Sequence, residues 1–290
     1  MILRCLWGIA LATALGMSGF GCDREKGTGP LLAQYENRAR VSDRDGRLYR
    51  LQGYNLRTSV DEGRTWRELG AVPARGYPVW GYSLACGDDG VLYFAHVGAG
   101  KGKKAVFISK SSDGGETWTT PSAVNEDVWA QRTDPVIMLR GRDVYVAWVE
   151  RSEKGPTGEE RPEGVYVNSS SNGGLDWGRD TWMREGEDCW LSTGDDEAIY
   201  LAYIAGERQD MVFISRSRDK AKTWESETTG EIWMMIKEPC VLPVGETLYL
   251  FFRGSKPAFA DLSPGKRLEY RTYLTVSKDG GETWTRAVEP

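Results

Sequence analysis

Five positions carry side chains that could bind or react with a ligand, and each precedes a repeated tyrosine by the same eleven residues. A carboxylate accepts hydrogen bonds from hydroxyl groups, a guanidinium binds anions through two parallel hydrogen bonds, and an aromatic ring stacks. Strand interiors favour valine or isoleucine, so ionisable groups at strand starts indicate a ligand site. The five residues are Arg38, Tyr82, Asp134, Cys189 and Glu238; a small register shift in the first two units would substitute Arg40 or Trp80.

Two kinds of repeat form the elements that would position these residues. The first is a short apolar run around a tyrosine, which is typical of a strand covered on both faces. No segment shows a convincing helical period, so the repeats predict an all-β fold. The runs occur at 46–51, 90–95, 143–148, 197–202 and 246–251.

The second repeat is an octapeptide with Ser first, Asp third, Gly fifth and Trp last. Ser and Asp accept hydrogen bonds from nearby backbone N–H groups, glycine adopts a left-handed conformation at little cost, and tryptophan buries a large apolar face. Ala221 replaces the glycine of the fourth copy, so we expect strain or a different turn type there. The third positions of the five copies are Asp61, Asp113, Asn172, Asp219 and Asp279.

With one strand added on either side, each of the five units has four strands, which indicates a β-propeller of four-stranded blades. The octapeptides resemble Asp boxes, also called bacterial neuraminidase repeats, and residues 31–290 resemble the sialidase superfamily. The resemblance implies that the boxes are structural turns between outer strands, away from the ligand. Known sialidases have six blades, so we expect either a five-bladed ring or an incomplete six-bladed one, with 284–288 as the last outer strand.

The segment from Glu238 to Arg253 resembles the part of a sialidase in which a glutamate begins an inner strand and an arginine ends the next strand. The resemblance implies that Glu238 polarises a tyrosine nucleophile, for which Tyr270 is the candidate. It also implies that Arg253 and Arg38 grip the substrate carboxylate, which arginine binds bidentately without losing its charge. A buried ion pair joining two strands of one blade is the open alternative for Glu238 and Arg253.

Further candidates for substrate binding lie near the predicted strand starts. Asp134, with Arg132 close by, is suited to bind a sugar hydroxyl group or a cation, and a turn at the strand start is the alternative. Trp80, Tyr82 and Trp190 would stack on sugar rings if exposed, because an aromatic plane desolvates C–H patches. Packing between blades is the alternative for all three.

The composition excludes several classes of protein. The 290 residues include 37 basic and 42 acidic ones without long runs of either, which argues against a nucleic-acid surface. A single histidine, His96, argues against a zinc hydrolase and a Ser-His-Asp triad. We expect a monomer with no metal and no cofactor. Cys86, Cys189 and Cys240 are expected as free thiols, with a Cys189–Cys240 bridge as the alternative.

The N-terminal segment is expected to be a targeting signal rather than part of the fold. Residues 1–21 contain one charge, an apolar run and small residues, which is typical of a secretory signal peptide. Residues 19–22 resemble a bacterial lipobox, which implies lipidation of Cys22; cleavage and release is the alternative. Residues 22–30 form a polar tether. We therefore expect an exported protein of the bacterial cell envelope, on its periplasmic or extracellular face, that meets the membrane only through the anchor.

Two functions from different classes are compatible with these features. The first is a sialidase-like propeller that binds glycans, with exo-hydrolysis of a terminal acidic sugar such as sialic acid if it is an enzyme. The second is a non-catalytic scaffold that binds a protein or peptide through the same face. The fold alone does not choose between them.

Overall fold

The computed structural model describes residues 40–74, 81–100, 103–126, 131–151, 158, 161–205, 211–228, 234–255 and 270–290. Strands are the only regular elements in these ranges, which confirms the predicted all-β class. Within the same ranges, no helix long and apolar enough to cross a membrane is found.

The strands form five antiparallel sheets, numbered here in chain order, and in each the neighbouring strands follow one another in the sequence. The first sheet holds β1 (Arg40–Ser42), β2 (Leu48–Gln52), β3 (Asn55–Ser59) and β4 (Arg67–Ala71), and the second β5 (Tyr82–Cys86), β6 (Leu92–Gly100), β7 (Lys103–Ser111) and β8 (Ser122–Ala123). The third holds β9 (Gln131–Arg140), β10 (Asp143–Arg151), β11 (Gly164–Ser170) and β12 (Thr181–Arg184), and the fourth β13 (Gly186–Thr193), β14 (Ile199–Ala205), β15 (Met211–Ser217) and β16 (Glu225–Thr228). The fifth holds β17 (Met234–Val244), β18 (Thr247–Ser255) and β19 (Arg271–Ser277).

The fifth sheet differs from the other four in having three strands. In place of the predicted fourth strand, Val288 forms an isolated bridge with Leu274, whose two backbone hydrogen bonds measure 2.8 and 3.0 Å. The chain near its C-terminus therefore lies along the outer edge of this sheet, but it does not form a full strand there.

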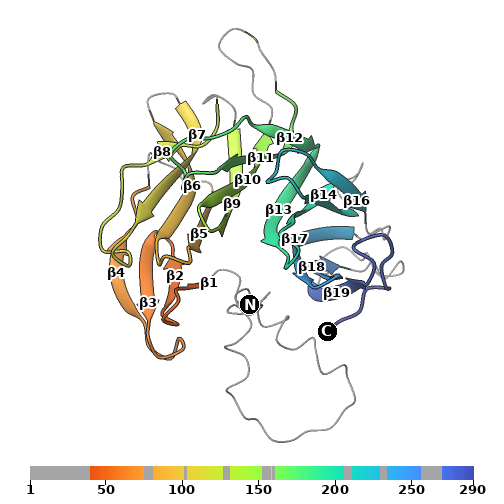
Figure 1. Ribbon diagram of the computed structural model, residues 1–290, viewed down its shortest axis with the longest axis horizontal. Helices are drawn as coiled ribbons and strands as arrows, with labels where there is room; N and C mark the ends of the chain where they lie inside the picture. Colours follow the sequence, from red (N-terminus) through yellow and green to blue (C-terminus); the bar gives the residue numbers. More distant parts are fainter. Residues whose placement is uncertain are drawn as a thin grey trace, which may run out of the picture.

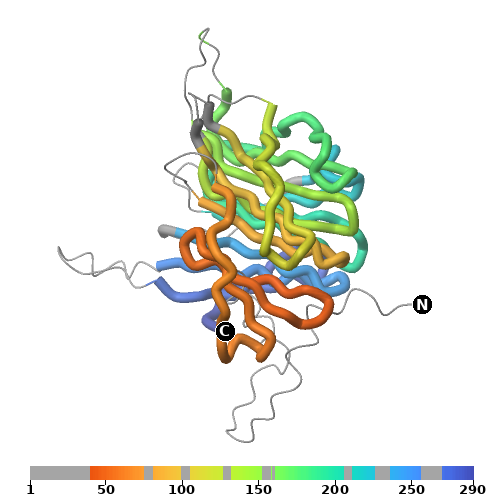
Figure 2. The backbone as a smooth tube through the Cα atoms, turned by 90° about the vertical axis from the view of Figure 1, so that its left-hand side faces the viewer, coloured from red at the N-terminus to blue at the C-terminus, as the bar shows by residue number. Residues whose placement is uncertain are grey.

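The five sheets are arranged in an arc, with the first sheet at one end and the fifth at the other (Figure 1). The first strand of each sheet faces the inside of the arc, and β1, β5, β9, β13 and β17 contact one another in that order. Seen from the side, strands of successive sheets run in broadly the same direction (Figure 2). The choice between a closed five-bladed ring and an incomplete six-bladed one stays a prediction.

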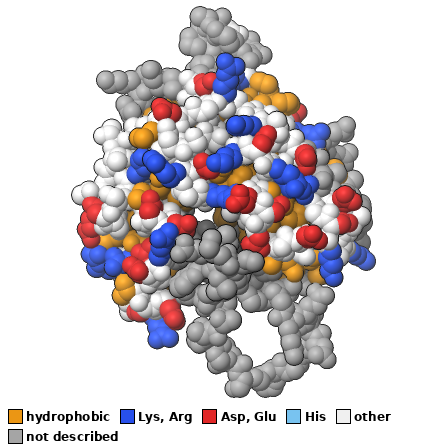
Figure 3. Space-filling view, viewed as in Figure 1, with side chains coloured by type: hydrophobic (Ala, Val, Ile, Leu, Met, Phe, Trp, Pro, Cys, Tyr) orange, Lys and Arg blue, Asp and Glu red, His pale blue; other side chains and the backbone are white. Residues whose placement is uncertain are grey.

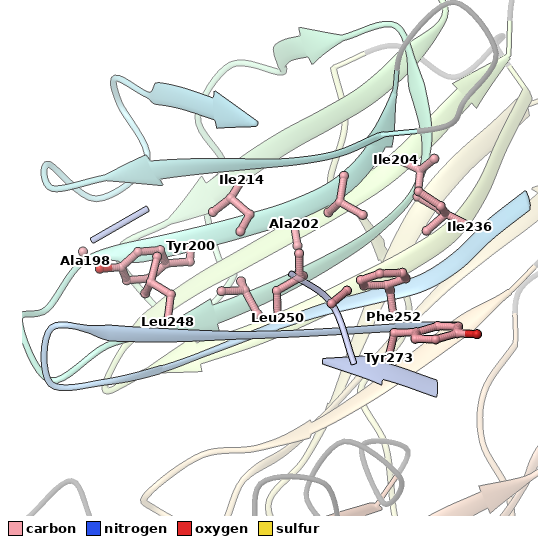
Figure 4. Packing of buried hydrophobic residues seen from close by; sticks show 13 residues of the cluster. Ala198, Tyr200, Ala202, Ile204, Ile214, Ile236, Leu248, Leu250, Phe252 and Tyr273 are labelled. Atoms are coloured by element: carbon pink, nitrogen blue, oxygen red, sulfur yellow. The ribbon is translucent and has the colours of Figure 1, made fainter. Parts of the chain in front are cut away.

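Apolar side chains fill the spaces between neighbouring sheets. Between the fourth and fifth sheets, Tyr200, Ala202 and Ile204 occupy every second position of β14 and face Leu250 and Phe252 of β18 (Figure 4). Successive side chains of a strand point to opposite faces, so each sheet contributes one row to each of its neighbours. Burying one large side chain contributes about 1.5–3 kcal/mol, and the layers between sheets hold the arc together.

The octapeptide turns connect the third and fourth strands of the first four sheets and follow β19 in the fifth. In the first, Gly63 N–H donates to Ser59 Oγ at 2.8 Å and Thr65 N–H to Asp61 Oδ1 at 2.9 Å. Hydrogen bonds from Thr65, through its hydroxyl and its N–H, and from Ser59 lower the pKa of Asp61 to about 2. Trp66 Nε1–H closes the turn on Gly63 O at 3.0 Å.

The two degenerate copies keep the turn by different means. Ala221 adopts a left-handed φ of 65° and donates its N–H to Ser217 Oγ at 2.8 Å, so the turn type is retained and the strain is borne by the alanine. In the third copy, Asn172 Nδ2 donates to Asp176 Oδ2 at 2.9 Å. This reverses the direction found in the first copy, where the hydroxyl of Thr65 donates to the carboxylate of Asp61. In the two degenerate copies alone among the described turns, the indole N–H of the final tryptophan is buried without a hydrogen-bond partner.

Candidate functional site

The inner strands of the third, fourth and fifth sheets each contain an acidic residue in the left-handed conformation. Asp134 has φ 51°, Asp188 has φ 48° and Glu238 has φ 55°. At each of them the pairing with the second strand of the sheet shifts register, as at a β-bulge. In the second sheet Gly81, with φ 95°, stands just before β5. Non-glycine residues rarely adopt such a φ, and strained positions of this kind cluster at functional sites.

Contacts between neighbouring sheets bring these bulges together. The backbone N–H of Glu238 donates to Asp188 Oδ2 at 2.6 Å, which joins the fourth and fifth sheets. A Cβ added to Gly81 would lie 2.9 Å from the backbone nitrogen of Asp134, so the second and third sheets approach closely at the same level. We call Asp134, Asp188 and Glu238 the acidic bulges.

Burial, helped by neighbouring carboxylates, raises the pKa of Asp188 from 3.8 to about 6. Burial is the largest cause, and the carboxylates of Asp134, Glu238 and Glu187 add to it, whereas the hydrogen bond from Glu238 N–H opposes them. Two of these carboxylates have basic partners: Glu238 Oε1 lies 3.6 Å from Arg253 Nη1, and Glu187 Oε2 lies 3.2 Å from Arg151 Nη2. Asp188 therefore titrates closer to neutral pH than an ordinary aspartate does.

The Glu238–Arg253 pair predicted from the sequence is present and partly open to solvent. The two side chains are 37% and 45% exposed, so the pair lies at the surface of the fifth sheet and a ligand can reach it. Tyr270 stands just before β19, and the Nζ of Lys237 lies 5.1 Å from the centre of its ring. The buried hydroxyl of Tyr270 has no hydrogen-bond partner, and it is not bonded to Glu238.

Arg132 lies in the interior of the third sheet rather than at its surface. Its side chain is 0% exposed, and Nη2 lies 3.2 Å from Oε2 of Glu150, which is 1% exposed. Glu150 Oε1 also pairs with Arg161 Nε at 3.0 Å, and Arg161 Nη1 reaches Asp180 Oδ2 at 3.1 Å. An enclosed guanidinium cannot contact a substrate, so the expected binding role of Arg132 does not agree with its placement.

The other predicted residues are divided between the surface and the packed interior. Asp134 is exposed, and Tyr82 is 38% exposed. Trp190 is partly buried against an apolar cluster of the fifth sheet, the arrangement that was the alternative to sugar stacking. Cys189 is 4% exposed between the third and fourth sheets and is a free thiol, as are Cys86 and Cys240. Arg38, Trp80 and Cys22 lie outside the described residues.

Counting back from the repeated tyrosine missed Asp188, the residue next to Cys189. Five residues separate the paired Thr193 and Ile199, whereas four separate Leu139 and Val144 at the equivalent turn of the third sheet. Counting back from Tyr200 therefore stops one residue short of the bulge, on Cys189, which is buried. The consecutive acids Glu187 and Asp188 before an apolar run were the available signal. Tyr54, which is 36% exposed in the turn between β2 and β3, was likewise not among the predicted site residues.

This arrangement can hold polar ligands by hydrogen bonds and charge. Acidic and basic side chains are interspersed over the face in Figure 3, without a broad region of one sign. Among the described residues, no three His, Cys, Asp or Glu side chains are placed to hold a metal ion.

No protein-family model matches the chain, and no curated protein sequence matches it. Solved structures do. A protein of unknown function from Dyadobacter fermentans has a TM-score of 0.56 at 17% identity, with 75% of this chain and 71% of that one covered. An α-L-arabinofuranosidase of Fusarium graminearum in complex with an iminosugar inhibitor has a TM-score of 0.54 at 12% identity, with 86% of this chain and 80% of that one covered. An ulvan lyase, which is a polysaccharide lyase, bound to a saccharide has a TM-score of 0.53 at 13% identity, with 85% of this chain and 68% of that one covered.

These likenesses show that the chain shares its all-β, propeller-type fold with carbohydrate-active proteins of known structure. Sialidases are also among the matching structures, with TM-scores of 0.49, and the chain spans 54% and 41% of two of them. At these identities the likeness concerns the fold alone.

Proposed function

We propose that the protein binds glycans at the inner strand starts, where the acidic bulges converge. The observation that carries this proposal is the direct contact of two strained bulges, through the 2.6 Å hydrogen bond from Glu238 N–H to Asp188. Three acidic residues held in a sparsely populated conformation by neighbouring sheets are typical of a ligand site. Carboxylates accept hydrogen bonds from sugar hydroxyl groups, and Arg253 donates them.

The fold supports the choice of glycans over a protein partner. The arabinofuranosidase and the ulvan lyase both act on carbohydrates by their names, and both match more than four-fifths of this chain. A shared fold does not transfer an activity, but it favours a sugar as the ligand of the equivalent face.

For hydrolysis of a terminal acidic sugar, Glu238 and Arg253 are the residues that we propose to act. Arg253 would bind the sugar carboxylate, and Glu238 would polarise a tyrosine. Tyr270 lies beside Lys237 in the same sheet, and its hydroxyl would have to move to reach Glu238. The geometry therefore supports binding more directly than it supports this reaction.

A glycan array probed with the purified protein tests the binding proposal. Fluorogenic sialosides and uronides, added separately, test hydrolysis. We expect binding that falls at least about tenfold in Glu238→Gln and in Arg253→Met, because each removes a polar contact worth about 1.5–3 kcal/mol with a charged group. Glu116→Gln is the matched control, since Glu116 forms an exposed ion pair with Arg67 beside a repeated turn. Binding of a protein partner without any glycan would support the scaffold alternative and contradict the proposal.

We further propose that the protein is exported and anchored in the bacterial envelope through a lipid on Cys22. Support comes from the charge, apolar run and small residues that precede this cysteine. Incorporation of a labelled fatty acid into the wild-type chain, and its loss in Cys22→Ala, is the expected result. Equal labelling of both chains would contradict lipidation at this position.

A further inference from the structure

Two exposed tyrosines from neighbouring sheets contact each other edge to face. Tyr54 lies in the turn between β2 and β3, and Tyr82 is the first residue of β5. Their ring centres are 6.0 Å apart with an angle of 61° between the ring planes. They are 36% and 38% exposed, so both rings are open to solvent on one side.

The pair lies at the end of the sheets that carries the acidic bulges. Tyr82 follows Gly81, whose added Cβ would lie 2.9 Å from the backbone nitrogen of Asp134. The octapeptide turns occupy the opposite end of each sheet, because they follow the third strand whereas Tyr54 follows the second. The tyrosines therefore lie at the same end of the sheets as the proposed glycan site, between the first and second sheets.

Buried aromatic side chains support the pair from below. The ring of Tyr82 lies 6.4 Å from that of Phe94, which stacks on His96 at 4.9 Å. His96 in turn lies 5.6 Å from Phe107. Phe94 and His96 are both 0% exposed, so Tyr82 rests on a packed column and its ring is held in place before any ligand arrives. A ring fixed in advance loses little conformational entropy on binding.

We propose that Tyr54 and Tyr82 form a subsite that stacks on a neutral sugar unit of the bound glycan. This subsite rests on the proposed function. An aromatic face desolvates the apolar C–H patch of a sugar ring. The two phenol rings carry no positive charge that would bind a sugar carboxylate, so the subsite takes a neutral unit even where a neighbouring unit is acidic.

The test begins with wild-type protein and three probes, xylohexaose, arabinohexaose and 3′-sialyllactose, measured by isothermal titration calorimetry. For any probe bound, Tyr54→Ala and Tyr82→Ala should weaken affinity about 5- to 10-fold, the range expected for one aromatic contact. Tyr54→Phe and Tyr82→Phe should remain within about twofold, because they retain the ring face. Trp182→Ala is the matched control, since Trp182 is 46% exposed on the outer strand β12, and it should leave affinity unchanged.

The outcomes separate this subsite from the proposed function. If the wild type binds none of these probes and no glycan on an array, the proposed function itself fails. If it binds a glycan but both alanine variants bind equally well, the function stands and the tyrosine subsite is refuted. A loss in Trp182→Ala as large as in the tyrosine variants also refutes it, as does binding restricted to fully anionic saccharides. Tyr82 packs on Phe94, so the thermal stability of each variant is measured as well. If Tyr82→Ala is unstable, the result for Tyr54→Ala decides the test, because Tyr54 lies in a turn.

Discussion

Replacing Glu150 with alanine should destabilise the protein severely. Glu150 is 1% exposed, forms ion pairs with Arg132 Nη2 at 3.2 Å and Arg161 Nε at 3.0 Å, and accepts a hydrogen bond from Trp148 Nε1 at 3.3 Å. Its removal takes the carboxylate away from the Arg132 guanidinium, which is 0% exposed. Breaking a buried ion pair by removing one partner costs about 3–5 kcal/mol, a large part of the stability of a typical domain.

A double variant separates the cost of a stranded charge from the loss of packing. In Arg132→Met with Glu150→Leu, both charges are replaced by apolar side chains of similar volume, which is often nearly neutral. Trp148 and Arg161 still lose an acceptor, although Arg161 keeps its contact with Asp180 at 3.1 Å. We therefore expect the double variant to recover about half of the loss seen in Glu150→Ala.

Urea unfolding followed by tryptophan fluorescence gives the free energies, with the slope checked for two-state behaviour. Glu116→Ala is the control: its ion pair with Arg67 is 54% and 63% exposed, and such pairs contribute about 0–1 kcal/mol. A loss in Glu150→Ala no larger than in this control would refute the reasoning. It would mean that water reaches Arg132, and a substrate-binding role for that residue would return.

Three further predictions concern the bulges and the turns. Folding raises the pKa of Asp188 from 3.8 to about 6, so between these pH values the native state binds more protons than the unfolded state and the stability of the wild type falls as pH rises. Denaturant titrations between pH 4 and 7.5 should show the unfolding free energy of Asp188→Asn rising relative to that of the wild type by up to about 3 kcal/mol. Gly115→Ala should cost about 2–4 kcal/mol, because at φ 96° its Cβ would clash with the Cδ2 methyl group of Leu56, whereas Gly63→Ala, whose nearest contact is 3.4 Å, should cost about 1–2 kcal/mol; equal thermal shifts would contradict this. Asn172→Asp should lower the melting temperature at pH 7, since it places two carboxylates together where Nδ2 now donates to Asp176 at 2.9 Å, and adding Asp176→Thr should restore it; no rescue would contradict the account of this turn.

Much of the fold was predictable because its signals are local. Hydrogen bonds within eight residues build each octapeptide turn, and a short apolar run around a tyrosine predicts each second strand from its own sequence. The adjacency of Glu238 and Arg253 followed for the same reason, since both belong to one hairpin of the fifth sheet. The fourth strand of that sheet was overestimated, because only Val288 pairs there.

The amino-acid sequence by itself determined the all-β class, the five units and the turns, which depend on contacts between residues close in the chain. Only the tertiary structure decided which side chains face the inside of the arc. The β13–β14 turn, one residue longer than the equivalent turn of the third sheet, places Asp188 rather than Cys189 at the bulge, and packing of the third sheet encloses Arg132 with Glu150. Packing between the first and second sheets joins Tyr54 to Tyr82. Turn lengths and bulges set which residue takes each position of a strand, and contacts between sheets join residues distant in the chain, so a fixed spacing along the sequence reveals neither.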